Sequence, residues 1–438
     1  MLKAYKYRIY PTEEQEYTLI QQFGIGRFIY NWVFDQKKKE YKVLKAWRQS
    51  PVGDKPKSLS SFDYCKLLTT LKTEIDWLRD ANAQALQQEI AHVFNAYSRF
   101  YKKLKERKAR KQKLTNKKGR LLDFPRFKSK KDRQSLSFPQ SVKVNFQAAW
   151  VQIPKVGKVP CVLSRQFTGT IKTATVSKET TGKYFVSVLI EDGATLPAAT
   201  EPIESDAIGI DVGLTHFATF STGEKIKNPR LLRRSLARLK KLQRSMARKK
   251  NRASKNGTSC GTTYRNYGKA KLRRALLEEH VANQRKDFLH KATHQLVCES
   301  QATTICVEEL SVRNMMANHK LARSIADVSW GEFFRQLKYK TLWRGKNLLE
   351  VGRFEPSSKT CWCCGFKMSE MPLCVRVWEC PGCRSVHDRD LNAAKNIVVF
   401  AFAKLGSFVN GLNEIPVGQP EIEACGQATS VTPCKGFE

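Results

Sequence analysis

Four cysteines near the end of the chain have the spacing of metal ligands. They form two pairs with two residues between the members of each pair, Cys361/Cys364 and Cys380/Cys383. Two such pairs, separated by enough chain for a hairpin, are typical of a zinc ribbon, in which four thiolates hold the ion tetrahedrally. Since the protein fills all four positions, we expect one structural Zn²⁺ rather than a set of free thiols. Cys363 and Cys374 are expected to be bystanders, although Cys363 could replace a neighbouring ligand.

Three acidic residues lie where α/β proteins commonly place reactive groups. Asp211 lies within the apolar segment 207–214, Glu308 directly follows the strand expected at 303–307, and Asp390 lies at the expected start of a helix. A carboxylate among Ile and Val is costly to bury unless it is paired or holds a metal. The carboxyl ends of buried strands are where α/β sheets place chemistry. The sequence therefore predicts that these three side chains act together.

The three carboxylates would converge in an RNase H-like α/β sheet. There they would hold Mg²⁺ through hard oxygen ligands, and two such ions could activate a water and stabilise the leaving oxygen of a phosphodiester. Taken alone, Asp390 is better explained as a plain helix N-cap. Asp388 and Glu309 are rival ligands. Asp390 is preferred because it begins the helix, and Glu308 because it follows the strand.

The charge balance indicates a polyanionic partner. The 438 residues include 78 Lys and Arg but 40 Asp and Glu, which gives a formal net charge of +38. Such an excess would repel itself without a counter-charge, and nucleic acid supplies one. The sequence has no apolar run long enough to span a membrane and no apolar signal-peptide core, so a cytoplasmic, nucleoid-associated protein is expected. The thirteen cysteines, several with metal-type spacing, favour a reducing compartment.

The start of the chain is expected to combine a strand with two helices. Residues 2–10 alternate apolar and basic side chains, as a strand with one basic face does. Thr12 with Gln15 gives a capping-box signal for the helix that follows. Gly24 and Gly26 are expected to interrupt that helix, which predicts a helix-turn-helix.

Two stretches carry candidate nucleic-acid contacts. The long helix expected over residues 82–111 has Gln84 and Gln87 near its start, and glutamine can bond an adenine edge bidentately. Residues 102–133 are saturated with Lys and Arg and interrupted by Phe124-Pro125-Arg126-Phe127. That mixture suits a surface that contacts phosphate and stacks on bases. The plain alternative for the glutamines is that they are ordinary surface residues, and for the basic run it is a solvated face or a disordered segment.

The rest of the chain alternates between strands and helices. Short alternating strands over residues 135–190 indicate a small β-barrel or sandwich. A very basic helix is expected over residues 231–255, and Ser329 with Glu332 gives another capping-box signal. After about Gly406 the chain has little periodicity and is expected to be disordered.

A series of short motifs in a fixed order is similar to that of a known family. The motifs are Tyr7-Arg8-Ile9-Tyr10-Pro11, Phe124-Pro125-Arg126-Phe127-Lys128, Gly209-Ile210-Asp211-Val212-Gly213, Gln284-Arg285-Lys286-Asp287-Phe288-Leu289-His290-Lys291, Val307-Glu308-Glu309-Leu310, Trp330-Gly331-Glu332-Phe333, the two cysteine pairs, and His387-Asp388-Arg389-Asp390 with Asn392-Ala393-Ala394. In these motifs the chain resembles TnpB, the RNA-guided nuclease encoded by insertion sequences and related to type V CRISPR effectors. Glu309 stands where such proteins often have Asp, which is a mild departure.

The resemblance implies a multidomain fold that combines α/β, β-barrel and helical parts. Its centre would be an RNase H-like (RuvC) nuclease domain with an inserted zinc ribbon. The implied domains are a wedge-type β-barrel domain (1–10 and 118–200), a helical recognition domain (11–117), the first part of the RuvC domain (205–355), the zinc ribbon (356–386), the final RuvC helix (387–403) and a disordered tail (404–438).

The resemblance also implies a function, namely an RNA-guided DNA endonuclease of an insertion sequence that cuts target DNA next to a short motif. Asp211, Glu308 and Asp390 would be its catalytic residues and would bind two Mg²⁺ for phosphodiester hydrolysis. The expected partners are a guide RNA and double-stranded target DNA, with a monomer bound to its RNA. Candidate nucleic-acid contacts are Gln84, Gln87, Arg126, Lys128, Gln140, Ser141, Arg285 and Lys286.

Two other functions remain open on the sequence. One is an RNA-guided or basic DNA-binding protein that regulates transcription or transposition without cutting. The intact acidic trio argues against it, because a binder has no use for three buried acids. The other is a compact type V CRISPR effector, which uses the same chemistry with a different guide. The short length of the chain favours TnpB.

Overall fold

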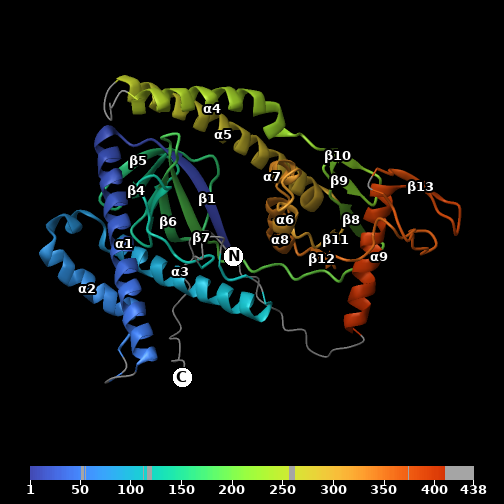
Figure 1. Cartoon of the computed structure of the whole chain (residues 1–438), viewed down its shortest axis with the longest axis horizontal. Coiled ribbons are helices and arrows are strands. Elements are labelled where there is room, and N and C mark those ends of the chain that lie inside the picture. Colours follow the sequence, from blue (N-terminus) through green and yellow to red (C-terminus); the bar gives the residue numbers. More distant parts are fainter. Residues whose placement is uncertain are drawn as a thin grey trace. The chain divides into compact units, whose positions relative to one another are not determined.

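The computed structural model describes residues 1–50, 54, 56–111, 113–115, 121–255, 262–372 and 374–409. The chain forms two compact units, one that includes Met1–Ala194 and one within Thr195–Ile422 (Figure 1). The first combines an antiparallel sheet with long helices, and the second combines a mixed sheet with helices on both faces. Among the described residues, none of the helices has the length and apolar character needed to cross a membrane.

The sheet of the first unit consists of seven antiparallel strands. They are β1 (Leu2–Ile9), β2 (Gln134–Phe138), β3 (Lys143–Asn145), β4 (Trp150–Ile153), β5 (Gly157–Val162), β6 (Thr170–Lys178) and β7 (Tyr184–Glu191). Their order is β2-β6-β7-β1-β5-β4-β3, so β2 and β3 lie at open edges. The sheet is therefore a half-barrel, where the alternating strands predicted a small β-barrel or sandwich.

The first strand of the chain lies in the middle of this sheet. It pairs with β7 along its whole length, from Leu2 opposite Glu191 to Ile9 opposite Tyr184, and with β5 on its other side. Alternate residues of β7 are buried, as period-two packing on one covered face requires. The structure thus joins the N-terminal strand to segments far along the chain.

Helix α1 (Glu13–Gln49) is continuous, and the predicted break at two glycines is wrong. The capping box at its start is confirmed, with Thr12 and Gln15 each accepting from the other's backbone N–H. A glycine costs a helix only about 1 kcal/mol, which the buried apolar face of α1 offsets. Gly26 serves close packing, since a Cβ there would lie 2.7 Å from Leu136 Cδ1.

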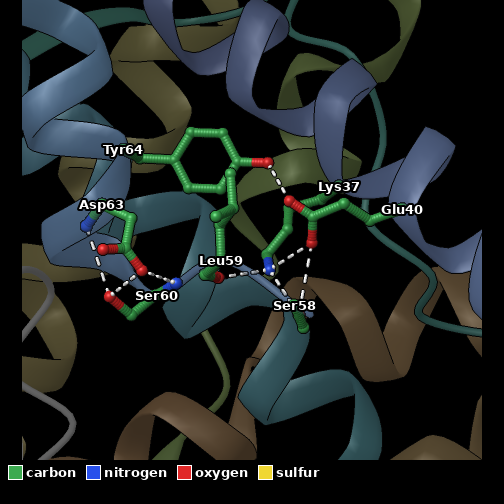
Figure 2. A network of polar contacts seen from close by, with 7 residues as sticks. All are labelled: Lys37, Glu40, Ser58, Leu59, Ser60, Asp63 and Tyr64. Atoms are coloured by element: carbon green, nitrogen blue, oxygen red, sulfur yellow. Dashed lines mark hydrogen bonds and ion pairs between the residues drawn. The ribbon is translucent and has the colours of Figure 1, made fainter. Parts of the chain in front are cut away.

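Figure 2 shows a polar network between α1 and α2 (Ser61–Glu74), a helix that the sequence did not predict. Lys37 donates to the Leu59 carbonyl at 2.8 Å, and Glu40 accepts from the Tyr64 hydroxyl of α2. Burial and this bond to Glu40 raise the pKa of Tyr64. The network holds α2 against α1, and both helices pack with α3 (Ala83–Ala109) around a shared apolar core.

The sheet of the second unit has five strands in the order β10-β9-β8-β11-β12. They are β8 (Ala207–Asp211), β9 (His216–Phe220), β10 (Lys225–Lys227), β11 (Thr304–Glu308) and β12 (Asn347–Val351). Strands β8, β11 and β12 are parallel to one another, whereas β9 is antiparallel to β8 and β10 is antiparallel to β9. The carboxyl ends of the three parallel strands therefore lie at one edge of the sheet.

Helices cover both faces of this sheet. One face packs against α5 (Thr262–His294), α7 (Ala322–Val328) and α8 (Trp330–Trp343), and the other packs against α9 (Arg389–Val409). Side chains alternate along a strand. Ile210 faces the α5 and α8 side, so Asp211 belongs to the face that α9 covers.

The remaining elements connect these layers. The basic helix predicted over 231–255 is confirmed as α4 (Leu231–Lys255), and it packs side by side with α5 (Figure 1). The others are the 3-10 helix η1 (Asp76–Asp80), the π-helix η2 (Gln295–Glu299), α6 (Val312–Met315), and the ribbon strands β13 (Val377–Glu379) and β14 (Val386–Asp388).

Two expectations about helix ends differ from the structure. Ser329 precedes α8 in a left-handed conformation (φ 59°) and makes no cap bond, while Glu332 bonds the side chains of Arg335 and Gln336. That capping box is therefore wrong, because Ser329 also ends α7 and donates to the Ala326 carbonyl instead. The tail expected from residue 404 is helical through residue 409, and residues 410–438 lie outside the described residues.

Candidate metal centres

The ends of β8 and β11 bring Asp211 and Glu308 next to each other. The last paired residues of these neighbouring parallel strands are Ile210 and Val307, and the two acids come one position later. Burial, then repulsion by Asp390 and Glu308, raises the pKa of Asp211 to about 8. Burial also raises the pKa of Glu308. The three predicted acids thus share one electrostatic environment, in which an added negative charge is unfavourable.

Helix α9 reaches these acids because β8 has a glycine beneath it. A Cβ at Gly209 would lie 1.9 Å from the carbonyl oxygen of Ala394 and 2.9 Å from Val398. Any amino acid with a Cβ at position 209 would collide with the helix backbone. Gly209 therefore lets the first turns of α9 lie directly on the strand that carries Asp211, with Asp390 in the first turn.

Asp388, and not Asp390, caps α9. Its Oδ1 accepts from the backbone N–H groups of Asp390 and Leu391 at 3.0 Å each, and its Oδ2 pairs with Lys225 at 2.7 Å. The N-cap explanation of Asp390 is therefore wrong. The Asp390 carboxylate lies 3.4 Å from Arg376 Nη1 and 4.0 Å from His216 Nδ1. Asp388 is engaged in capping, whereas the Asp390 carboxylate is free of that role. We refer to Asp211, Glu308 and Asp390 as the acidic cluster.

Glu308 and Glu309, the two candidate ligands at the end of β11, differ in ion pairing. Glu309 pairs with Arg353 at 2.6 Å, and its side chain is 54% exposed. Within the described residues, neither Asp211 nor Glu308 forms an ion pair. The carboxylate oxygens of Asp211 and Glu308 are hard donors of the kind that a divalent cation such as Mg²⁺ takes, so the chemistry of these donors is compatible with the metal that the sequence predicted.

The four paired cysteines gather around one point. Their sulfurs lie within 4.8 Å of one another, with Cys361 and Cys383 at 3.7 Å and Cys364 and Cys380 at 3.6 Å. Zinc–sulfur bonds of about 2.3 Å in a tetrahedron put sulfurs about 3.8 Å apart. The cluster could therefore bind a zinc ion, and it fits one closely.

A second arrangement of possible ligands shares one of these cysteines. Cys361, Cys363 and His387 also lie within 4.8 Å of one another. His387 Nε2 is 3.0 Å from Cys361 Sγ. The expectation that Cys363 could take part in ligation thus has a geometric basis, whereas Cys374 belongs to neither group among the described residues.

Known proteins match this chain over most of its length. A family model described as "Probable transposase" (OrfB_IS605) matches residues 185–319, one described as a Cas12f1-like TNB domain matches 330–397, and one described as a helix-turn-helix domain matches 1–45. A putative RNA-guided DNA endonuclease of Streptomyces pristinaespiralis is 35% identical over 92% of this chain and 90% of its own length. The chain belongs to the TnpB family.

Further TnpB relatives cover the chain to a similar extent. The putative RNA-guided DNA endonuclease InsQ of Escherichia coli is 29% identical over 92% of this chain and 93% of its own length. A solved structure of a Cas12f1–sgRNA–target DNA complex aligns with 91% of this chain and 98% of its own at 15% identity and a TM-score of 0.46. In this TnpB chain, the segment matched by the helix-turn-helix model consists of β1 and most of the unbroken helix α1.

Some predicted nucleic-acid contacts of this TnpB chain are engaged in internal bonds. Gln84 donates to Gln140 at 2.6 Å, which brings two of the candidates together. Lys128 pairs at 2.5 Å with Glu89, a residue that is only 2% exposed. Arg285 pairs at 3.0 Å with Asp327. These contacts give Lys128 and Arg285 structural roles that the sequence did not reveal.

The other candidates are less constrained. Gln87 and Lys286 are exposed, each on the surface of its long helix. Ser141 has a left-handed backbone (φ 62°) in the turn after β2. Arg126 lies between Phe124 and Phe127, whose rings pack edge to face on Phe100 and Phe34. The aromatic residues in the basic stretch thus pack on α1 and α3, while Phe124 and Phe127 remain 36% and 46% exposed.

Sequence reasoning missed two buried amides. Asn392 and Asn396 of α9 are 1% and 2% exposed and bond the backbone of the cysteine-bearing segment. Their spacing of four residues on an otherwise apolar helix was a signal, since a buried amide needs partners. His216 of β9, whose Nδ1 lies 4.0 Å from the Asp390 carboxylate, was not predicted as part of the site.

Proposed function

We propose that this chain is an RNA-guided DNA endonuclease of an insertion sequence that cuts target DNA next to a short motif. The observation that carries the proposal is the acidic cluster at the ends of β8 and β11, where burial and then two neighbouring carboxylates disfavour the charged form of Asp211. Such a cluster is unfavourable for stability and useful for holding cations. Relatives at 35% and 29% identity are named putative RNA-guided DNA endonucleases, which supports the same activity here.

In this proposal Asp211, Glu308 and Asp390 are the catalytic residues of a RuvC-type centre. They would hold two Mg²⁺, which when bound supply an activated water and stabilisation of the leaving oxygen. Asp388 fixes the first turn of α9 by capping it and pairing with Lys225. Gly209 sets the distance between that turn and β8. The cysteine cluster would hold one structural Zn²⁺.

The proposed partners are a guide RNA and double-stranded target DNA, bound by one copy of the chain. Helix α4 supports a phosphate-binding role, because it contains no acidic residue and exposes many cations. Its exposed basic residues are Arg233, Arg234, Arg238, Lys240, Lys241, Arg244, Arg248 and Lys250. Base pairing would select the target, while such a surface holds the duplex by charge and shape.

The test is cleavage of a supercoiled plasmid library by protein purified with its cellular RNA, in Mg²⁺ and in EDTA. Glu308→Gln and Glu309→Gln form a matched pair, because they remove the same charge at adjacent positions. We expect guide-matched linear product with the natural chain and with Glu309→Gln, and none with Glu308→Gln or in EDTA. RNA-dependent binding without cutting in any condition would overturn the proposal and favour a regulator.

A further inference from the structure

Asn392 and Asn396 connect α9 to the cysteine-bearing segment. Both side-chain amides donate to the same two carbonyls, those of Ser357 and Thr360; the Asn392 bonds are 3.3 and 2.7 Å long and the Asn396 bonds are 2.7 and 2.5 Å long. The Asn392 Oδ1 also accepts from the backbone N–H of Trp362 at 3.1 Å. Together these bonds, which we call the asparagine clamp, hold the backbone on both sides of Cys361.

The first cysteine is also held from the start of α9. His387 Nε2 lies 3.0 Å from Cys361 Sγ, and His387 pairs with Trp378 in the β13–β14 hairpin. The next residue, Asp388, is the cap of α9. The cysteine turn therefore contacts α9 through the asparagine clamp on the helix and through the strand that runs into it.

The same segment contacts the acidic cluster. Arg376, which precedes β13, lies 3.4 Å from the Asp390 carboxylate, and its carbonyl accepts from the Arg389 N–H at 2.8 Å. Displacing the cysteine-bearing segment would therefore move the backbone and the counter-charge around Asp390.

We propose that the asparagine clamp is a positioning device through which zinc in the cysteine cluster sets the place of Asp390. This rests on the proposed function, since it takes Asp390 to be a ligand of the catalytic cations. A side-chain amide is both donor and acceptor, so Asn392 can bond the Trp362 N–H and two carbonyls at once. The two metal sites are then thermodynamically coupled, and loading one strengthens the other.

The experiment measures divalent binding rather than cutting. Ca²⁺ is titrated calorimetrically into the full chain with its RNA, because Ca²⁺ binds carboxylate oxygens and not thiolates. Zinc-loaded and zinc-free preparations are compared for the natural chain, Asn396→Ala, Asn392→Ala and Asn392→Asp, with zinc content measured on each. The matched control is Ile397→Ala, which truncates a buried α9 residue that faces β11 and β12 rather than the ribbon.

We expect zinc removal to weaken Ca²⁺ binding by about tenfold in the natural chain and in Ile397→Ala. The alanine variants should bind Ca²⁺ weakly even when they hold zinc, and zinc removal should weaken them no further. Asn392→Asp keeps the acceptor for the Trp362 N–H, so its Ca²⁺ affinity should lie between those of the natural chain and the alanine variants. Equal Ca²⁺ affinity with and without zinc in the natural chain would overturn the coupling.

Two further measurements separate the possible failures. Asp390→Ala abolishes tight Ca²⁺ binding if Asp390 is a cation ligand, so unchanged binding in that variant would refute the proposed function itself. If the alanine variants do not fold, hydrogen exchange on the natural chain decides the inference. Zinc removal should then speed amide exchange at residues 389–394 and leave β8 unchanged, and equal exchange at 389–394 would overturn it.

Discussion

Single acids in this chain differ by the partner that each one finds. Asp388 accepts two backbone N–H groups and pairs with Lys225, and Glu309 pairs with Arg353. Asp211 and Glu308 form no ion pair within the described part of the chain, and burial raises the pKa of both. Acids with a cap or ion-pair role should stabilise the fold, whereas the proposed cation ligands should not, so the two groups should respond differently to substitution.

Asp211 predicts an unusual pH dependence for the metal-free protein. Its pKa is about 8 in the folded chain against an ordinary 3.8, so between these values folding takes up a proton and stability falls as pH rises. Asp211→Asn lacks this penalty. Thermal unfolding in EDTA should show the variant gaining over the natural chain by at most about 1.4 kcal/mol per pH unit, levelling off above about pH 8. Mg²⁺ should reduce this difference in unfolding free energy between the variant and the natural chain. A difference that does not change with pH would contradict its assignment to the raised pKa of Asp211.

Asp388 and Asp390 should separate stability from activity. Asp388→Ala loses the α9 cap and should cost about 1 kcal/mol of unfolding free energy. Asp390→Asn keeps the cap and relieves repulsion on Asp211, so its melting temperature should not fall, while cleavage should drop more than about 100-fold. Unfolding curves and single-turnover cleavage check both. Loss of stability in Asp390→Asn with normal cutting would reverse the two assignments.

Elements are held at short distances by glycine in two places. In α1, Gly26 lies against Leu136, and in β8, Gly209 lies against the backbone of α9. Each glycine allows close approach within a regular element and does not end it. This is why Gly26 failed as a break signal, since local propensity cannot distinguish a turn from a packing contact.

Gly209→Ala should displace α9 from the sheet. The added methyl would meet a backbone carbonyl at 1.9 Å, and overpacking of this kind costs about 3 kcal/mol. Gly331→Ala is the matched control, because nothing lies within 4 Å of a Cβ there and alanine favours helix α8. We expect Gly209→Ala to melt lower and lose cleavage, and Gly331→Ala to match the natural chain in both. A tolerated Gly209→Ala would mean that α9 does not rest on β8.

At the scale of the whole molecule, the net charge indicates the kind of partner, and the architecture shows which cations are available to bind it. The formal net charge of +38 predicts a polyanionic partner without saying where it binds. The structure shows many cations already paired with carboxylates, as Lys128 is with Glu89, and others without acidic neighbours on their own helix, as in α4. Only the cations without acidic neighbours should contribute to nucleic-acid binding through release of counterions.

Guide RNA binding should therefore depend steeply on salt, and α4 should account for part of the slope. The test variant replaces four exposed residues of α4 with glutamine, namely Arg233, Arg234, Arg238 and Lys241. Its log–log slope should fall by about 0.7 to 0.9 for each phosphate that the helix no longer neutralises. A control variant removes four cations that pair with carboxylates, namely Arg274, Lys291, Arg335 and Lys338. Filter binding from low to high salt should show the slope change only in the first variant, and equal changes would rule out a special role for α4.

The sequence by itself determined what depends on composition, spacing and local periodicity. The basic charge, the two cysteine pairs and the family motifs needed no coordinates. The alternating strand β4 lies within the stretch where short strands were predicted, because period-two burial depends on neighbouring residues alone. The acidic trio was named from strand and helix ends, and its catalytic role stays a prediction.

The tertiary structure decided which side chains find distant partners. It paired Gln84 with Gln140, kept α1 unbroken and joined Asn392 and Asn396 to the cysteine turn. Each of these depends on a group that lies far away in the sequence or on a packing distance, and neither leaves a periodic trace. A polar residue shows in the sequence that it needs a partner, and only the fold shows which partner it has.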